Sequence, residues 1–186
     1  LGDLINNDNL IQQWINANKS MSILDKKIPW TVLPGNHDFK ENDSTNYENY
    51  FGYLRFEGYG WYKGHYPNWS NLNNYALLNI NDMKLGFLNL KYMPYYPNLS
   101  ALEWARDVVN ENSDYTFIII THAYIGFATG GLGRDPKIWD NFIKNHENIF
   151  LVIAGHTKSP QEASYEKEGI NGNVVCEILS NYQTSQ

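Results

Sequence analysis

Residues 28–38 read Ile28-Pro29-Trp30-Thr31-Val32-Leu33-Pro34-Gly35-Asn36-His37-Asp38. The apolar run at residues 28–33 predicts a short buried strand that stops at the proline and glycine. The tetrapeptide Gly35-Asn36-His37-Asp38 then places amide, imidazole and carboxylate groups directly after that strand. On its own the tetrapeptide is also compatible with an ordinary turn, because residues of these types are common in turns.

Two further strand ends repeat this arrangement. The apolar run at residues 115–120 leads into Thr121-His122-Ala123-Tyr124, and a third run leads into Gly155-His156-Thr157-Lys158. Buried strands that alternate with helices are typical of layered α/β sheets, which bind ligands beyond the carboxyl ends of their strands. Asp3 joins the same edge if Leu1 closes a fourth strand.

The residue types at these strand ends favour a metal site. A lone histidine such as His122 is often only a hydrogen-bonded structural residue, but independent turns would not gather Asp, Asn and two His at successive strand ends. Imidazole nitrogens with carboxylate or amide oxygens suit Zn, Fe and Mn. The single cysteine, Cys176, excludes an internal disulfide framework and a thiolate-based zinc site.

The rest of the chain predicts an α/β framework in a single domain that spans residues 1–186, since no repeat or linker divides it. Residues 40–70 are aromatic and rich in turns, and we expect an irregular cover with short helical pieces, on whose rings a sugar or nucleoside could stack. The predicted regular elements are helices at 9–18, 100–110 and 136–145, a strand at 149–154, and hairpins formed by 75–80 with 85–90 and by 163–168 with 174–179.

Composition narrows the classes of partner. The net charge is −6, which argues against a nucleic-acid-binding patch, because phosphate backbones are bound by concentrated Lys and Arg. No apolar run approaches the ~18 residues of a transmembrane segment. The chain begins without Met or a signal peptide, so its localisation stays open.

The succession Gly2-Asp3, Gly35-Asn36-His37-Asp38, Thr121-His122 and Gly155-His156 resembles the calcineurin-like metallophosphoesterase family over essentially the whole chain. The resemblance implies a four-layer α/β/β/α sandwich of two mixed sheets with two divalent metal ions (Mn, Fe or Zn) in a cleft. It also implies hydrolysis of phosphomonoesters or phosphodiesters, a small-molecule substrate class, by a hydroxide generated at the dinuclear centre.

Carried onto this chain, the resemblance assigns a role to each residue of the motifs. Asp3 resembles the carboxylate that bridges the two metals, and Asn36, His122 and His156 resemble ligands of the second metal. His37 resembles the group that donates a proton to the leaving oxygen or steadies the phosphoryl group, and Asp38 resembles its orienting partner. Apart from the resemblance, the positions of Tyr124, Arg134 and Lys158 in the chain suggest substrate contacts, and Arg134 could equally be a surface charge.

This sequence departs from the family pattern in two places. The opening Asp-x-His motif is not found before Gly2-Asp3, so the first strand of the fold is expected to be missing. The usual Gly-His-x-His ends in Lys158, and a protonated lysine cannot be a metal ligand. Lys158 either approaches the substrate phosphate or lies in solvent. The alternative function is therefore a catalytically impaired scaffold that acts as a binding module.

Two further histidines fall outside the pattern. His146 is interpreted as a solvated residue at a helix end, and His65 as part of the aromatic segment. The substrate itself cannot be deduced from these residues, because nothing among them separates a nucleotide from a sugar phosphate or a lipid phosphate.

Overall fold

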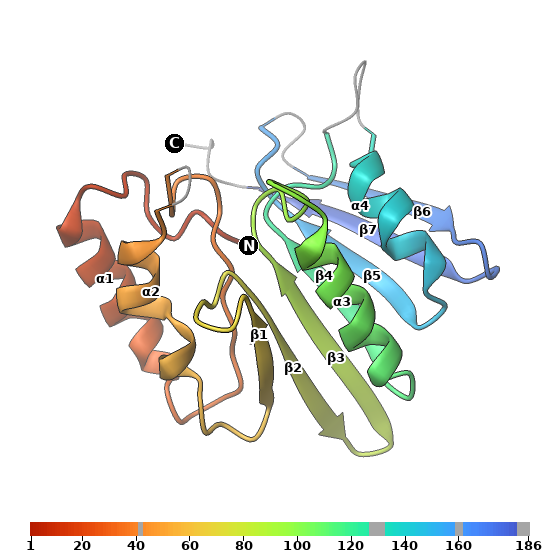
Figure 1. Ribbon diagram of the computed structural model, residues 1–186, viewed down its shortest axis with the longest axis horizontal. Coiled ribbons are helices and arrows are strands. Elements are labelled where there is room, and N and C mark those ends of the chain that lie inside the picture. The colour runs from red at the N-terminus through yellow and green to blue at the C-terminus, as the bar shows by residue number, and fades with distance from the viewer. Residues whose placement is uncertain (41–42, 127–132, 159–161, 182–186) are drawn as a thin grey trace.

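The computed structural model describes residues 1–40, 43–126, 133–158 and 162–181, which contain seven strands and four α-helices (Figure 1). The strands are β1 (Tyr62–Tyr66), β2 (Asn73–Ile80), β3 (Met83–Leu90), β4 (Thr116–Thr121), β5 (Ile149–Ala154), β6 (Glu162–Glu168) and β7 (Val174–Ser180). The helices are α1 (Ile11–Met21), α2 (Thr45–Phe51), α3 (Ser100–Glu111) and α4 (Pro136–Asn141), with short 3₁₀ turns at Ser22–Leu24, Tyr53–Arg55 and Ile143–Asn145.

The strands form one mixed sheet in the order β1-β2-β3-β4-β5-β7-β6. The pairs β1–β2, β2–β3 and β6–β7 are antiparallel, whereas β3, β4, β5 and β7 run parallel to one another. The carboxyl ends of these four parallel strands therefore meet at one edge of the sheet, which is where the predicted site residues follow them.

The predicted α/β class is confirmed, but the arrangement of the strands differs from the two-sheet sandwich that the family resemblance implied. The described strands form one continuous sheet where two mixed sheets were implied. The link is the parallel pairing of β3 with β4, which runs without interruption from Leu85 opposite Thr116 to Leu90 opposite Thr121.

Only part of the segment 28–33 is buried, and the segment does not form the predicted strand. Trp30, Val32 and Leu33 have little exposed surface, yet the backbone joins no ladder. Side chains take the place of a neighbouring strand: the carbonyl of Val32 accepts from Nδ2 of Asn74 at 2.8 Å and from the hydroxyl of Tyr47 at 3.4 Å. Burial was therefore readable from the apolar run, whereas strand pairing was not.

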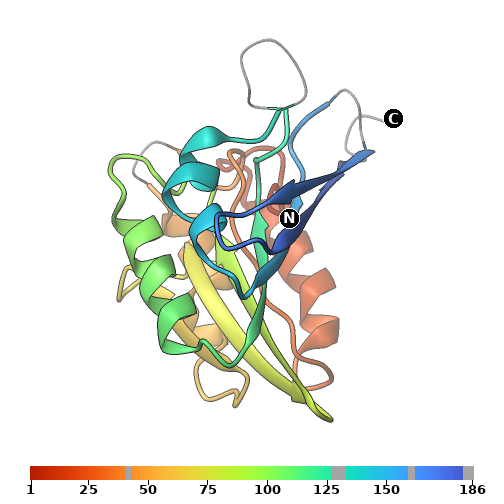
Figure 2. The same cartoon turned by 90° about the vertical axis from the view of Figure 1, so that its right-hand side faces the viewer.

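The helices cover the sheet from two sides. Figure 2 shows α3 and α4 on one side of the sheet and α1 on the other. Under α3 and α4 lies the larger core, built on Phe117, Ile119 and Val152 of the central strands. Under α1 and α2 lies a smaller, aromatic core around Trp14 and Phe51.

The regular elements largely follow the sequence. Both predicted hairpins are present as β2–β3 and β6–β7, and β5 has the predicted bounds. The helix predicted at 136–145 splits into α4 and a 3₁₀ turn. The aromatic segment 40–70 is more regular than expected, because it contains α2 and β1. No helix among the described residues is long and apolar enough to cross a membrane.

Candidate metal centre

Four side chains from four separate loops meet at the carboxyl edge of the sheet. His122 follows β4 and His156 follows β5, so the parallel pairing of these strands brings the two imidazoles together. Nε2 of His122 lies 3.0 Å from Nδ1 of His156 and 3.0 Å from Oδ1 of Asn36. It also lies 3.4 Å from Oδ2 of Asp3. Three polar atoms thus converge on a single nitrogen.

These donors fit a divalent transition-metal ion. One ligand atom from each of Asp3, His122 and His156 lies within 4.8 Å of the other two, the one such cluster found in the described part of the chain. The amide oxygen of Asn36 adds a fourth donor beside His122. Two imidazole nitrogens with two oxygens form a donor set that suits Zn, Fe and Mn.

The hydrogen bonds of His122 prepare its ring for such a role. Nδ1 lies 2.7 Å from the carbonyl oxygen of Leu1, which can only accept, so Nδ1 carries the hydrogen and Nε2 presents its lone pair. Burial lowers the pKa of His122, against an opposing contribution from the charge of Asp3. The neutral ring, which is the form that binds metals, is therefore favoured.

Glycine is required where the two N-terminal loops cross. A Cβ on Gly2 would lie 2.6 Å from the backbone nitrogen of Gly35 and 2.7 Å from Nδ1 of His122. A Cβ on Gly35 would lie 2.5 Å from the backbone nitrogen of Asp3. The glycines of both motifs therefore permit the close approach that brings Asp3 and Asn36 to the histidines.

Two of the converging residues adopt a left-handed backbone conformation. Asp3 has a φ of 52° and His156 has a φ of 67°, a region that residues other than glycine adopt at some cost. Such conformations persist where the surrounding structure determines them strongly, and they are concentrated at functional sites.

His37 and Asp38 lie at the cluster, but not in the predicted partnership. His37 is exposed, its backbone N–H donates to Oδ1 of Asp3 at 3.1 Å, and its Nδ1 lies 2.8 Å from the carbonyl of Asn6. The buried carboxylate of Asp38 instead accepts from the backbone N–H groups of Ile5 and Gly35 at 3.1 and 2.8 Å. The prediction that Asp38 orients His37 is therefore wrong: Asp38 ties the two loops together, and Asn6 orients the imidazole.

Burial raises the pKa of Asp38 to about 6, against the opposing effect of its backbone hydrogen bonds. The carboxylate is deep enough to lose hydration and yet receives two N–H donors. Its place in the molecule is that of a loop anchor.

Two predicted substrate contacts, Tyr124 and Arg134, are corrected by the structure. Tyr124 has no exposed surface, and its hydroxyl donates to Oε1 of Glu177 at 2.6 Å. Arg134 donates to the same carboxylate from Nε at 2.7 Å and from Nη2 at 2.8 Å. Both side chains are engaged by a buried glutamate on β7, which the sequence did not reveal as their partner.

Lys158 is exposed, two residues beyond His156. Burial lowers the pKa of His156, and the positive charges of His37 and Lys158 add to this effect against the opposing charge of Asp3. Lys158 therefore lies close enough to the cluster for its charge to be felt there. The choice between a phosphate contact and a solvated residue stays a prediction.

Sequence reasoning missed Tyr92. Its ring lies 5.7 Å from that of His122 and 5.3 Å from that of His156, so it covers one side of both imidazoles. A signal was present, because Tyr92 comes two residues after the end of β3, at the same sheet edge. It was masked by the aromatic content of the surrounding chain.

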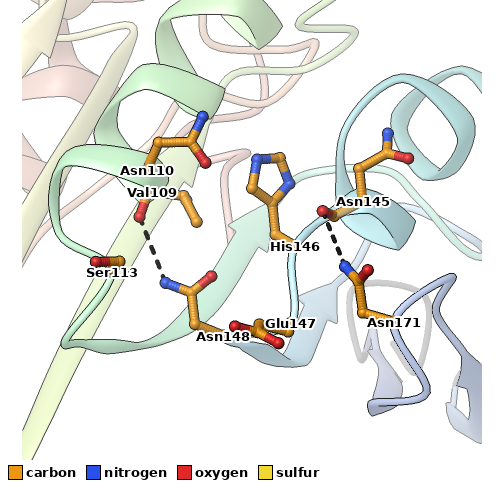
Figure 3. A pocket seen from close by; sticks show the side chains of 8 residues that line it. All are labelled: Val109, Asn110, Ser113, Asn145, His146, Glu147, Asn148 and Asn171. Atoms are coloured by element: carbon orange, nitrogen blue, oxygen red, sulfur yellow. Dashed lines mark hydrogen bonds between the residues drawn. The ribbon is translucent and has the colours of Figure 1, made fainter.

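His146 is not the solvated residue that was predicted. It is buried, and its Nδ1 lies 2.8 Å from the carbonyl of Phe142. Figure 3 shows its ring beside Asn110 and Asn145, in a hollow of about 300 Å³ where four of the eight lining residues are asparagines. His146 precedes β5 whereas His156 follows it, so this hollow lies at the opposite end of the strand from the metal-binding cluster.

Comparisons with known proteins give a matching family, a curated relative and a solved structure. The family described as calcineurin-like phosphoesterase matches residues 1–160. A curated relative, "Uncharacterized protein YvnB" of Bacillus subtilis (strain 168), is 31% identical over 189 residues, which cover 98% of this chain and 14% of that protein. This chain thus corresponds to a small part of that relative. Among solved structures, the NAD nucleotidase (NadN) of Haemophilus influenzae is 13% identical, with a TM-score of 0.38 over 55% of this chain and 24% of that one.

Proposed function

Since the chain belongs to the calcineurin-like phosphoesterase family, we propose that it hydrolyses phosphomonoesters or phosphodiesters at the cluster of Asp3, Asn36, His122 and His156. The observation that carries the proposal is the convergence of a carboxylate oxygen, an amide oxygen and a second imidazole on Nε2 of His122. These four side chains would hold the divalent cation. Such ions polarise phosphoester oxygens and turn water into a strong nucleophile at neutral pH.

The finer proposal is a dinuclear centre of Mn, Fe or Zn in which Asp3 serves both ions. Its two oxygens already face different neighbours: Oδ2 faces His122, while Oδ1 accepts from the backbone N–H of His37. A carboxylate with divergent oxygens is suited to a shared position between two cations.

His37 is proposed as the group that protonates the leaving oxygen. The carbonyl of Asn6 can only accept, so Nδ1 of His37 carries a hydrogen and the ring is held in one orientation. Among the described residues Nε2 of His37 has no partner, and the side chain is exposed beside Asp3, to which its backbone N–H donates. A positioned acid of this kind contributes about 10²- to 10⁴-fold to the rate.

The second candidate is a phosphoesterase scaffold that binds a ligand without cleaving it. Lys158 favours this alternative, because it stands where the family pattern has a further metal ligand and its ammonium group cannot coordinate a cation. The two candidates differ in turnover: the enzyme is expected to cleave esters when metal is bound, whereas the scaffold is expected to bind metal without cleaving them.

The deciding experiment loads the protein with Mn²⁺, Zn²⁺ or Fe²⁺, measures bound metal by elemental analysis, and follows release of p-nitrophenol from p-nitrophenyl phosphate and from bis(p-nitrophenyl) phosphate. We expect metal-dependent cleavage that is abolished in Asp3→Asn and His122→Ala and retained in His146→Gln. His37→Ala should lose about 10²- to 10⁴-fold with an alkyl ester such as glycerol 3-phosphate, whose leaving alkoxide needs a proton, and much less with the p-nitrophenyl esters. Bound metal without cleavage of either ester would replace the enzyme by the scaffold. A protein that retains no metal would overturn the cluster as a metal site.

A further inference from the structure

Two adjoining hollows lead away from the metal-binding cluster. The first, of about 210 Å³, is lined by Asn36 of the cluster and by Phe39, Lys91 and Tyr96 among others. The second, of about 430 Å³, shares Phe39, Lys91 and Tyr96 with the first but does not reach Asn36. The second hollow therefore lies one step further from the cluster, and its volume is that of a small-molecule site.

The second hollow carries exposed aromatic rings. Trp69 is 73% exposed and Tyr96 is 60% exposed, although aromatic side chains of this size usually bury most of their surface. Within the described residues neither ring stacks on another aromatic side chain, whereas Tyr66 in the same wall stacks on Trp104 with ring centres 5.8 Å apart. Two ring faces are thus left for a ligand.

The wall that bears Tyr96 is fixed rather than loose. Nζ of Lys91 donates to the carbonyl of Tyr96 at 2.9 Å and lies 5.7 Å from the centre of the Phe39 ring. The backbone N–H of Lys91 donates to Oδ1 of Asn73 on β2 at 3.0 Å. A wall held to the sheet in this way offers a preformed surface, which lowers the entropic cost of binding.

The lining favours a planar ring over an acyl chain. Hydroxyl and amide side chains from Ser44, Asn73, Asn98 and Ser100 alternate with the rings and prolines of the second hollow. Asn73 and Ser100 are already hydrogen-bonded within the protein, but the hydroxyl of Ser44 and Nδ2 of Asn98 have no partner among the described residues. A lipid chain would leave these two groups dehydrated and unpaired, whereas an aromatic heterocycle stacks on rings and hydrogen-bonds at its edge.

We propose that the second hollow binds a planar aromatic ring in the alcohol portion of the substrate, and that a spacer crossing the first hollow joins this ring to the phosphoester, as in a nucleoside phosphate. The assignment rests on the proposed phosphoesterase function, because it takes the cluster as the place of the phosphoryl group. Trp69 and Tyr96 supply the stacking faces, and Lys91 positions the wall between them and the cluster.

The first arm of the test needs neither metal nor hydrolysis. Binding of adenosine and of ribose to the metal-free protein is measured by isothermal titration calorimetry. Adenosine is expected to bind, whereas ribose is expected not to bind. Trp69→Ala or Tyr96→Ala should weaken adenosine binding about tenfold, and Trp69→Phe should recover part of the affinity lost in Trp69→Ala. Leu54→Ala is the matched control, since Leu54 is 69% exposed and lines neither hollow.

The second arm compares kcat/KM for adenosine 5′-monophosphate and ribose 5-phosphate, which share the same primary phosphoester. The wild type is expected to prefer the nucleotide about tenfold. Trp69→Ala should remove this preference, and the control Leu54→Ala should keep it. Equal binding of adenosine by wild type and both alanine variants would overturn the subsite even if hydrolysis is found. Binding that depends on Trp69 in a protein that hydrolyses no ester would retain the subsite and reject the phosphoesterase.

Discussion

Nε2 of His122 lies 3.0 Å from Nδ1 of His156, although the two residues are 34 positions apart in the chain. Two imidazoles at this separation cannot both be protonated without strong repulsion, and burial lowers the pKa of each. The arrangement therefore keeps two neutral nitrogen ligands side by side. It arises from the parallel pairing of β4 with β5, which brings both strand ends to one edge.

The first prediction concerns stability in the presence of a metal. Zn²⁺ or Mn²⁺ at about a hundred times its dissociation constant should add about 2.7 kcal/mol to the free energy of unfolding, because the cation binds only the folded cluster. The shift should vanish in His122→Ala and persist in His146→Gln, as measured by thermal unfolding with and without the ion. An unchanged shift in His122→Ala would place the bound ion elsewhere.

The second prediction concerns Gly35. In Gly35→Ala the new methyl would lie 2.5 Å from the backbone nitrogen of Asp3 and 2.7 Å from Cε1 of His122, so the two loops must separate. A displacement of about 1 Å at the cluster is expected to lower any metal-dependent activity about a hundredfold. Gly60→Ala is the matched control, because a methyl there meets nothing within 4 Å. Equal activity of the two variants would contradict the tight crossing of the loops.

The cluster was largely predictable because it depends on strand ends. Parallel strands bring their carboxyl ends to one edge, so His122 and His156 could be assigned to one site from the order of apolar runs alone. The glycines before Asp3 and Asn36 agree with this, since both permit a close approach of backbone that a side chain would block.

The residues that were misassigned have partners far away in the sequence. Tyr124 and Arg134 contact Glu177, which lies 53 and 43 positions further along the chain. No local sequence pattern predicts contacts between residues so far apart. Asp38 and His37 are adjacent in the chain, and each contacts the N-terminal segment separately, Asp38 at Ile5 and His37 at Asn6. Residues 28–33 are a similar case. The apolar run predicts burial, but strand pairing also needs a neighbouring strand, which the local sequence does not specify.

The third prediction concerns the buried carboxylate of Glu177. Its side chain is 1% exposed and is neutralised by Arg134, with a further hydrogen bond from Tyr124. Arg134→Met should destabilise the protein by about 3 kcal/mol, because it leaves a buried charge without its counter-ion. Adding Glu177→Leu to that variant should restore part of the loss, because it removes the unpaired charge but leaves the buried hydroxyl of Tyr124 without its acceptor. Urea denaturation measures both, and a double variant no more stable than Arg134→Met would show that the two side chains are not coupled.

The fourth prediction concerns His146 and pH. Burial lowers the pKa of His146 from its ordinary value of 6.5, the charge of Arg106 acts in the same direction, and the carbonyl of Phe142 opposes both. As pH falls through 6.5, the unfolded chain therefore takes up a proton before the folded protein does, and stability is lost until the folded pKa is passed. In His146→Gln this loss should disappear, so the free energy of unfolding should fall less steeply than in the wild type. Urea denaturation at about pH 7.5 and about pH 5.5 gives the change in the free energy of unfolding between the two pH values for each protein. Both proteins carry His122 and His156, so the titration of these two residues cancels when the two changes are compared. Parallel pH profiles for the two proteins would mean that His146 is protonated as readily inside the fold as in the unfolded chain.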